Sequence, residues 1–148
     1  CKCSIYAVER YRSKISGPLL DRIDMHVQVS AIPLIELQSK RKQECSSDIK
    51  KRVMRARKIQ EDRCKNSQYI FWNSNLSTDQ IKSVCSLPKD ANHLLENAMN
   101  QLNLSARSYH RILKVSRTIA DLEGSDRILS NHIAEALHYR CLDRGQLN

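Results

Sequence analysis

The stretch 104–124 constrains the fold most, because it has the pattern of one long amphipathic helix with a recognisable residue at each end. Ser105 is a good N-cap, and Gly124 stands where a left-handed residue would end the helix. Between them, one set of residues recurs at spacings of three and four and predicts a single buried stripe: Tyr109, Ile112, Leu113, Ser116, Ile119 and Ala120.

Another face of the same predicted helix carries Arg107, Arg111 and Lys114 at spacings of four and three. Arg107 falls in the first turn, where the helix macrodipole disfavours a cation by about 0.3–1 kcal/mol. Free backbone N–H groups together with an arginine, however, make a strong phosphate site. The alternative is a solvated face, because arginine is a good helix former. For Arg111, Lys114 and Arg117 we favour the solvated face over an interface or a DNA path.

Composition narrows the possible partners. The chain has 148 residues, enough for one domain with a core, and a formal net charge of +9. That charge favours polyanions such as nucleic acid, or phosphates at a subunit interface, although many basic domains bind neither. The sequence has only three glycines, and no pair of them fits a P-loop or a dinucleotide fingerprint. There is no run of 18 apolar residues, so no membrane span is expected.

The six cysteines predict a cytoplasmic protein with reduced thiols, because most have no close partner in the sequence. Cys85 and Cys141 fit apolar helix stripes. Cys1 and Cys3 have the spacing of half of a four-thiolate zinc site, whose other ligands would lie upstream. We therefore predict no metal site within the chain. Because the first methionine is Met25, we expect the sequence to be a piece of a longer protein.

One strand is predicted, and it lies before a polar boundary. Ile23, Met25, Val27 and Val29 alternate with polar residues, the pattern of a half-buried strand. A lone strand cannot satisfy its own backbone groups, so its sheet partners would lie outside this chain. The polar stretch 38–47 that follows predicts a domain boundary.

Five helices are predicted beyond that boundary. They cover about 48–64, 77–86, a stretch begun by Pro88, the Arg107 helix, and about 130–143. Ser77 and Gln80 form a capping box. The loop 65–76 holds the aromatic run 69–72, which either closes the core or offers a base-stacking patch. The inward residues of the other helices are Ile49, Val53, Ala56 and Ile59; Ala91, Leu94, Leu95, Ala98 and Leu102; and Ile133, Ala136, Leu137 and Cys141.

Two segments carry a resemblance beyond these general patterns. Lys-Ile-Ser-Gly-Pro-Leu-Leu-Asp-Arg-Ile-Asp at 14–24 and the helix at 104–124 closely resemble the ComM/YifB family of AAA+ ATPases, which is related to the magnesium chelatase I subunit. The similarity continues through Ser-Ser at 46–47, Arg-Val at 52–53 and His-Ile-Ala-Glu-Ala-Leu at 132–137. It covers nearly the whole chain in order.

The resemblance implies a mainly α fold, the C-terminal helical-bundle lid of an AAA+ ATPase, preceded by one strand left over from the α/β core. Residues 1–40 would be the tail of that core, and residues 41–148 the lid. ATP and Mg²⁺ would be the cofactors of the full-length protein. In such rings the nucleotide lies between core and lid, at a subunit interface.

The resemblance also implies roles for two arginines. Arg22 matches the arginine finger that reaches the γ-phosphate of the neighbouring subunit, and Arg107 matches the sensor-2 arginine of the lid. A guanidinium at this position neutralises charge on the transferred phosphoryl group. From the residues alone, Arg22 could instead form a surface salt bridge with Asp21 or Asp24. His110 and His132 are expected to pack or cap rather than bind metal.

For the whole protein, the resemblance implies a hexameric ring that acts on DNA, in branch migration during uptake of transforming DNA. Without Walker residues, this chain alone is expected neither to bind ATP tightly nor to hydrolyse it. The alternative is a basic helical module that binds nucleic acid or a protein with no ATPase role. Metal insertion is a weaker alternative, because a shared fold does not carry that chemistry.

Overall fold

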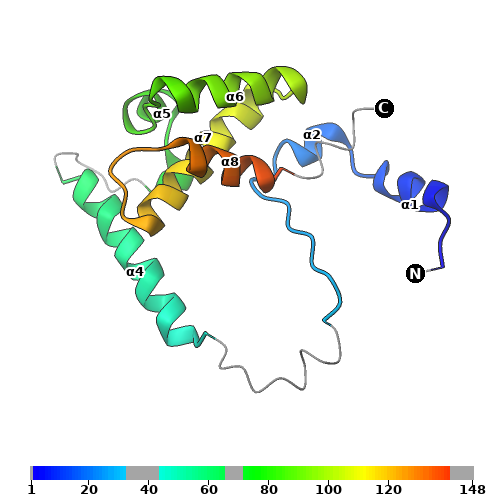
Figure 1. Ribbon diagram of the computed structural model, residues 1–148, viewed down its shortest axis with the longest axis horizontal. Helices are drawn as coiled ribbons and strands as arrows, with labels where there is room; N and C mark the ends of the chain where they lie inside the picture. Colours follow the sequence, from blue (N-terminus) through cyan, green and yellow to red (C-terminus); the bar gives the residue numbers. More distant parts are fainter. Residues whose placement is uncertain (1, 33–43, 66–71, 141–148) are drawn as a thin grey trace.

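A computed structural model describes residues 2–32, 44–65 and 72–140, and these ranges are helical, with no strand among them (Figure 1). The mainly α fold predicted from the sequence is confirmed. The helices are α1 (Ile5–Arg12), α2 (Gly17–Leu20), α4 (Ser46–Arg63), the 3-10 helix η1 (Asn73–Asn75), α5 (Thr78–Val84), α6 (Lys89–Gln101), α7 (Ala106–Glu123) and α8 (Ser130–His138).

Helix α7 is the centre of the bundle and contacts α4, η1, α5 and α8, while α6 packs on α8 (Figure 1). Both predicted ends are confirmed. The Ser105 Oγ accepts a hydrogen bond from the Ser108 N–H at 3.2 Å, and Gly124 is left-handed with φ 78°. The predicted stripe faces inward, with Ile112, Leu113 and Ala120 fully buried.

The core lies where α6, α7 and α8 meet. Ala91 and Leu95 of α6 are inaccessible to solvent, as are Ile128 and Ile133 next to and within α8. Fully burying one such large side chain stabilises the fold by about 1.5–3 kcal/mol. The predicted capping box at the start of α5 is present. This short helix packs on the core through Ile81.

Helix α4 begins and ends close to the predicted positions, but only its second half packs as expected. Ala56 and Gln60 are buried, whereas Ile49 and Val53 are 43% and 45% exposed. The prediction that these two residues point into the core was wrong, because the first half of α4 extends away from the bundle (Figure 1). Of the aromatic run 69–72, only Trp72 lies within the described residues, with the Arg57 guanidinium 4.3 Å from its ring centre.

The predicted strand at 23–29 was also wrong. These residues form no strand, since the described ranges contain no strand that could pair with them. The segment instead contacts the residue after α8 through a backbone hydrogen bond, from the His26 N–H to the Tyr139 carbonyl at 2.7 Å. Helix α8 ends at His138, and the predicted continuation through 143 lies outside the described residues beyond Arg140. No described helix combines the length and apolar character needed to cross a bilayer.

Candidate functional site

The segment that carries Arg22 docks on the beginning of α7. Gly17 and Pro18 start the single turn of α2, because proline is favoured at the first positions of a helix. This turn buries Leu20 and leaves Asp21 at its C-terminal end. The Asp21 Oδ1 accepts a hydrogen bond from the Ser108 Oγ at 3.0 Å. Residues 87 positions apart in sequence are thus in direct contact.

Arg140, just beyond α8, completes this junction. Its side chain is only 1% exposed. It donates hydrogen bonds to the Ile23 carbonyl at 2.5 Å and to the Ser108 Oγ at 3.2 Å, and it lies 3.9 Å from the Asp21 carboxylate. We did not predict this role from the sequence. The available pattern was its spacing, because Arg140 follows Leu137 by three residues and so continues the buried stripe of α8.

Arg22 and Arg107 flank the junction, each one residue away from the Asp21–Ser108 hydrogen bond. Both side chains are exposed, and neither forms a salt bridge with a carboxylate of the described residues. The alternative salt bridge from Arg22 to Asp21 or Asp24 is therefore absent from this part of the chain. Asp21 is engaged by Ser108 and Arg140 instead. The geometry leaves two guanidinium groups available to an anion.

Arg111 and Lys114, the other two cations of this face, make contacts within the chain. Arg111 forms an ion pair with Asp24, which ties the docked segment to α7 a second time. The Lys114 Nζ donates to the Ser74 carbonyl at 2.9 Å, and burial, with the nearby Arg111 charge, lowers the pKa of Lys114. Both side chains are half-buried, so the solvated face that we favoured for them was wrong.

The same expectation was wrong for Arg117, which is 2% exposed. Its Nε donates to the Asp121 Oδ1 at 3.0 Å, and its other nitrogens donate to the carbonyls of Ser125 and Asp126. Asp121 also accepts from Asn73 at 2.7 Å and from Arg63. Burial lowers the pKa of Arg117, and the Asp121 charge opposes this effect. Only the four-residue spacing of Arg117 and Asp121 pointed to such a network in the sequence.

The histidines and cysteines of the described ranges make no evident metal site, since no three His, Cys, Asp or Glu side chains converge there. His132 caps α8, as predicted, because its Nδ1 accepts from the Leu129 N–H at 2.9 Å. Cys85 is buried, which raises the pKa of its thiol to about 11. Cys3 and Cys45 are exposed free thiols. Cys1 and Cys141 lie outside the described residues.

Arg22 and Arg107 each have the chemistry to bind an anion, because a guanidinium group can donate paired hydrogen bonds to phosphate or carboxylate oxygens. The three glycines of the sequence do not have the spacing of a phosphate-binding loop.

The bundle and its docked N-terminal segment define the class: a helical C-terminal domain of the magnesium chelatase type. Residues 43–140 match the family described as magnesium chelatase, subunit ChlI C-terminal, and residues 1–37 match magnesium chelatase, subunit ChlI. The chain belongs to this family.

Two relatives confirm the resemblance to the ComM/YifB group. The competence protein ComM of Haemophilus influenzae is 41% identical over 138 residues, which are 93% of this chain and 26% of the relative. The YifB protein of Salmonella typhimurium is 38% identical over 144 residues, 97% of this chain and 28% of the relative. The chain thus spans about a quarter of the length of these relatives.

Proposed function

We propose that this chain is the C-terminal part of a magnesium-chelatase-like AAA+ ATPase and that it contributes Arg22 and Arg107 to ATP hydrolysis. The observation that supports this most is the pair of exposed arginines, without carboxylate partners among the described residues, on either side of the Asp21–Ser108 hydrogen bond. In this proposal residues 1–40 are the tail of the ATPase core, and residues 41–148 are the lid.

The two arginines have different roles in the proposal. Arg22 is the arginine finger, which reaches the γ-phosphate bound by the neighbouring subunit of a hexameric ring. Arg107 is the sensor-2 residue, which contacts the γ-phosphate from the lid. ATP with Mg²⁺ supplies the phosphoryl group when bound, and the guanidinium groups offset the negative charge on its oxygens.

We further propose that the ring acts on DNA. The net charge of +9 suits a polyanion, and a relative carries the name competence protein. Arg111 and Lys114 are the candidate DNA or interface contacts, and they would have to serve in addition to their contacts with Asp24 and Ser74. Arg111 is the weaker candidate of the two, because its charge already has a partner.

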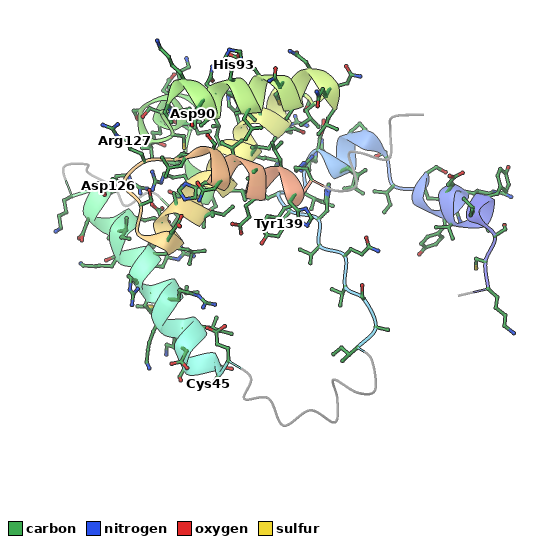
Figure 2. All side chains as sticks on the ribbon, viewed as in Figure 1. Cys45, Asp90, His93, Asp126, Arg127 and Tyr139 are labelled. Atoms are coloured by element: carbon green, nitrogen blue, oxygen red, sulfur yellow. The ribbon has the colours of Figure 1, made fainter. Side chains whose placement is uncertain are left out.

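The first test is the ATPase activity of the full-length protein, with and without branched DNA. Arg107→Ala is expected to lower DNA-stimulated turnover by about 10²-fold, the cost of losing one donor to the reacting group. Arg127→Ala is the matched control, because Arg127 is an exposed arginine in the loop between α7 and α8 (Figure 2). Unchanged turnover in Arg107→Ala would reject the sensor assignment. DNA binding by a wild-type protein without ATPase activity would favour a basic binding module.

A second test addresses Arg22. The Arg22→Ala variant is expected to lose hydrolysis by about 10³-fold or more while it still binds ATP. Rings mixed from Arg22→Ala and a variant that cannot bind ATP should regain part of the turnover, because the intact arginine of one subunit then serves the nucleotide of the other. A complete lack of recovery would contradict the role between subunits.

A further inference from the structure

The segments that carry Arg22 and Arg107 are joined by one hydrogen-bonded cluster. Asp21 precedes Arg22, Ser108 follows Arg107, and their side chains lie 3.0 Å apart. Consecutive Cα atoms are about 3.8 Å apart, so each arginine stands a single residue from a shared contact. A change in this contact would therefore alter how the backbone at Arg22 lies relative to the backbone at Arg107.

Arg140 is the residue that holds the cluster closed. Its guanidinium reaches both sides of the junction, the Ile23 carbonyl at 2.5 Å on the docked segment and the Ser108 Oγ at 3.2 Å on α7. A guanidinium presents its N–H donors in a rigid planar fork, so the two acceptors are fixed in relative position. Burying this charge is unfavourable unless hydrogen bonds compensate it, so the buried guanidinium depends on its contacts with the docked segment and α7.

The end of α8 supports the same junction. The Tyr139 carbonyl, beside Arg140, accepts the His26 N–H at 2.7 Å, and Figure 2 shows Tyr139 at the point where the docked segment passes α8. We propose that Arg140 is a positioning residue, which fixes the segment 20–26 against α7 and so sets Arg22 relative to Arg107. The effect on hydrolysis rests on the proposed function, whereas the docking does not.

The docking is tested first on the 148-residue chain by amide hydrogen exchange. In Arg140→Ala, the amides of Arg22, Ile23 and His26 are expected to exchange at least about tenfold faster, while the Leu95 amide in α6 keeps its rate. Asp21→Ala removes the other side of the same contact. Because the Asp21 side chain is 32% exposed, this variant is the substitute if Arg140→Ala does not fold. Asp79→Ala, which removes an exposed carboxylate on α5, is the matched control. Unchanged exchange at 22–26 in both variants overturns the proposal.

The second arm measures steady-state ATP hydrolysis by the full-length protein. Asp21→Ala and Arg140→Ala are expected to lower kcat at least about tenfold with KM for ATP within about twofold, since the contact acts on the reacting phosphate and not on ATP capture. Arg140→Lys keeps the positive charge but not the planar set of N–H donors, so its kcat should lie between those of Arg140→Ala and the wild type. Faster exchange with unchanged kcat overturns the positioning role. A wild-type protein without ATPase activity contradicts the proposed function instead, and the exchange data still decide the docking.

Discussion

The two ends of α7 use arginine in opposite ways. Near the C-terminal end, Arg117 is buried against Asp121, which also accepts from Arg63 and Asn73. At the N-terminal end, Arg107 is exposed and has no salt bridge to a carboxylate of the described residues. The arginine at one end of the helix is buried in a hydrogen-bonded network, and the arginine at the other end is exposed to solvent.

This difference separates residues that stabilise the fold from residues available for function. A buried charge is tolerated only when it is paired and hydrogen-bonded, so the Arg117 network must be complete. An exposed arginine can be lost at little cost to stability, so a loss of activity on its removal can be told apart from a loss of the fold. The predictions below test this contrast, beginning with the largest effect.

The Asp121→Asn variant should show the largest loss of stability. It leaves Arg117 and Arg63 without their negative partner in a site where Asp121 is inaccessible to solvent. The free energy of unfolding is expected to fall by about 3–5 kcal/mol, measured by urea denaturation. Arg107→Ala, at the other end of α7, is the comparison and should change it by less than about 0.5 kcal/mol. Equal losses of unfolding free energy in Asp121→Asn and Arg107→Ala would contradict the proposed difference between the two ends of α7.

The Cys85 thiol gives a second, pH-dependent test of the region around the Arg117 network. Burial raises its pKa from 9.0 to about 11, against the opposing effect of the nearby Arg117 and Arg63 charges. In the unfolded chain the thiol ionises from about pH 9, whereas in the folded chain it keeps its proton. Its contribution to stability is therefore fully present below pH 9 and is lost as the pH rises to about 11.

The expected loss is about 2–3 kcal/mol, the free-energy equivalent of moving the pKa from 9.0 to about 11. Cys85→Ala should have a flatter dependence of unfolding free energy on pH between 9 and 11 than the wild type. Cys45→Ala is the control, because Cys45 is exposed. Parallel wild-type and Cys85→Ala curves would show that the thiol is not protected from ionisation.

Much of the bundle could be predicted from the sequence, because local rules and tertiary packing agree there. The cap at Ser105, the left-handed Gly124 and the buried stripe of α7 each follow from residue type and spacing. The strand at 23–29 could not be judged in this way, because a strand depends on partners that the described residues do not contain. Apolar alternation shows which residues would share one face of a strand, but it does not supply a partner strand.

The polar side of the site was harder to predict for a physical reason. Helical spacing says which residues share a face, but it does not say which charge finds which partner across the bundle. Arg22 had two carboxylates nearby in sequence and forms a salt bridge with neither, because Asp21 and Asp24 meet Ser108 and Arg111 on α7. Arg140 similarly acts on a segment 117 residues earlier in the chain.

Substitutions at the two capping residues of α7 are expected to cause smaller losses of stability, of similar size at its two ends. Gly124→Ala is expected to cost about 1–2 kcal/mol, because φ is 78° and a Cβ there is strained although no atom lies within 4 Å of it. Ser105→Ala removes the hydrogen bond to the Ser108 N–H and should cost about 1 kcal/mol. Gly124→Asn is the control, since asparagine tolerates the left-handed region. Thermal unfolding should then rank Asn above Ala at this position.

The smallest effect is expected for Asp24→Asn, which breaks the ion pair with Arg111 at the N-terminal end of α7. The side chains of Arg111 and Asp24 are 24% and 53% exposed, so water and salt already screen the pair. We expect a loss of about 0.2–1 kcal/mol that shrinks further in 1 M NaCl, measured by urea denaturation at both salt concentrations. A loss as large as that of Asp121→Asn, unchanged by salt, would mean that the docked segment is as integral to the fold as the Arg117 network. Arg22 would then be displayed by part of the core itself, and not by a segment attached to its surface.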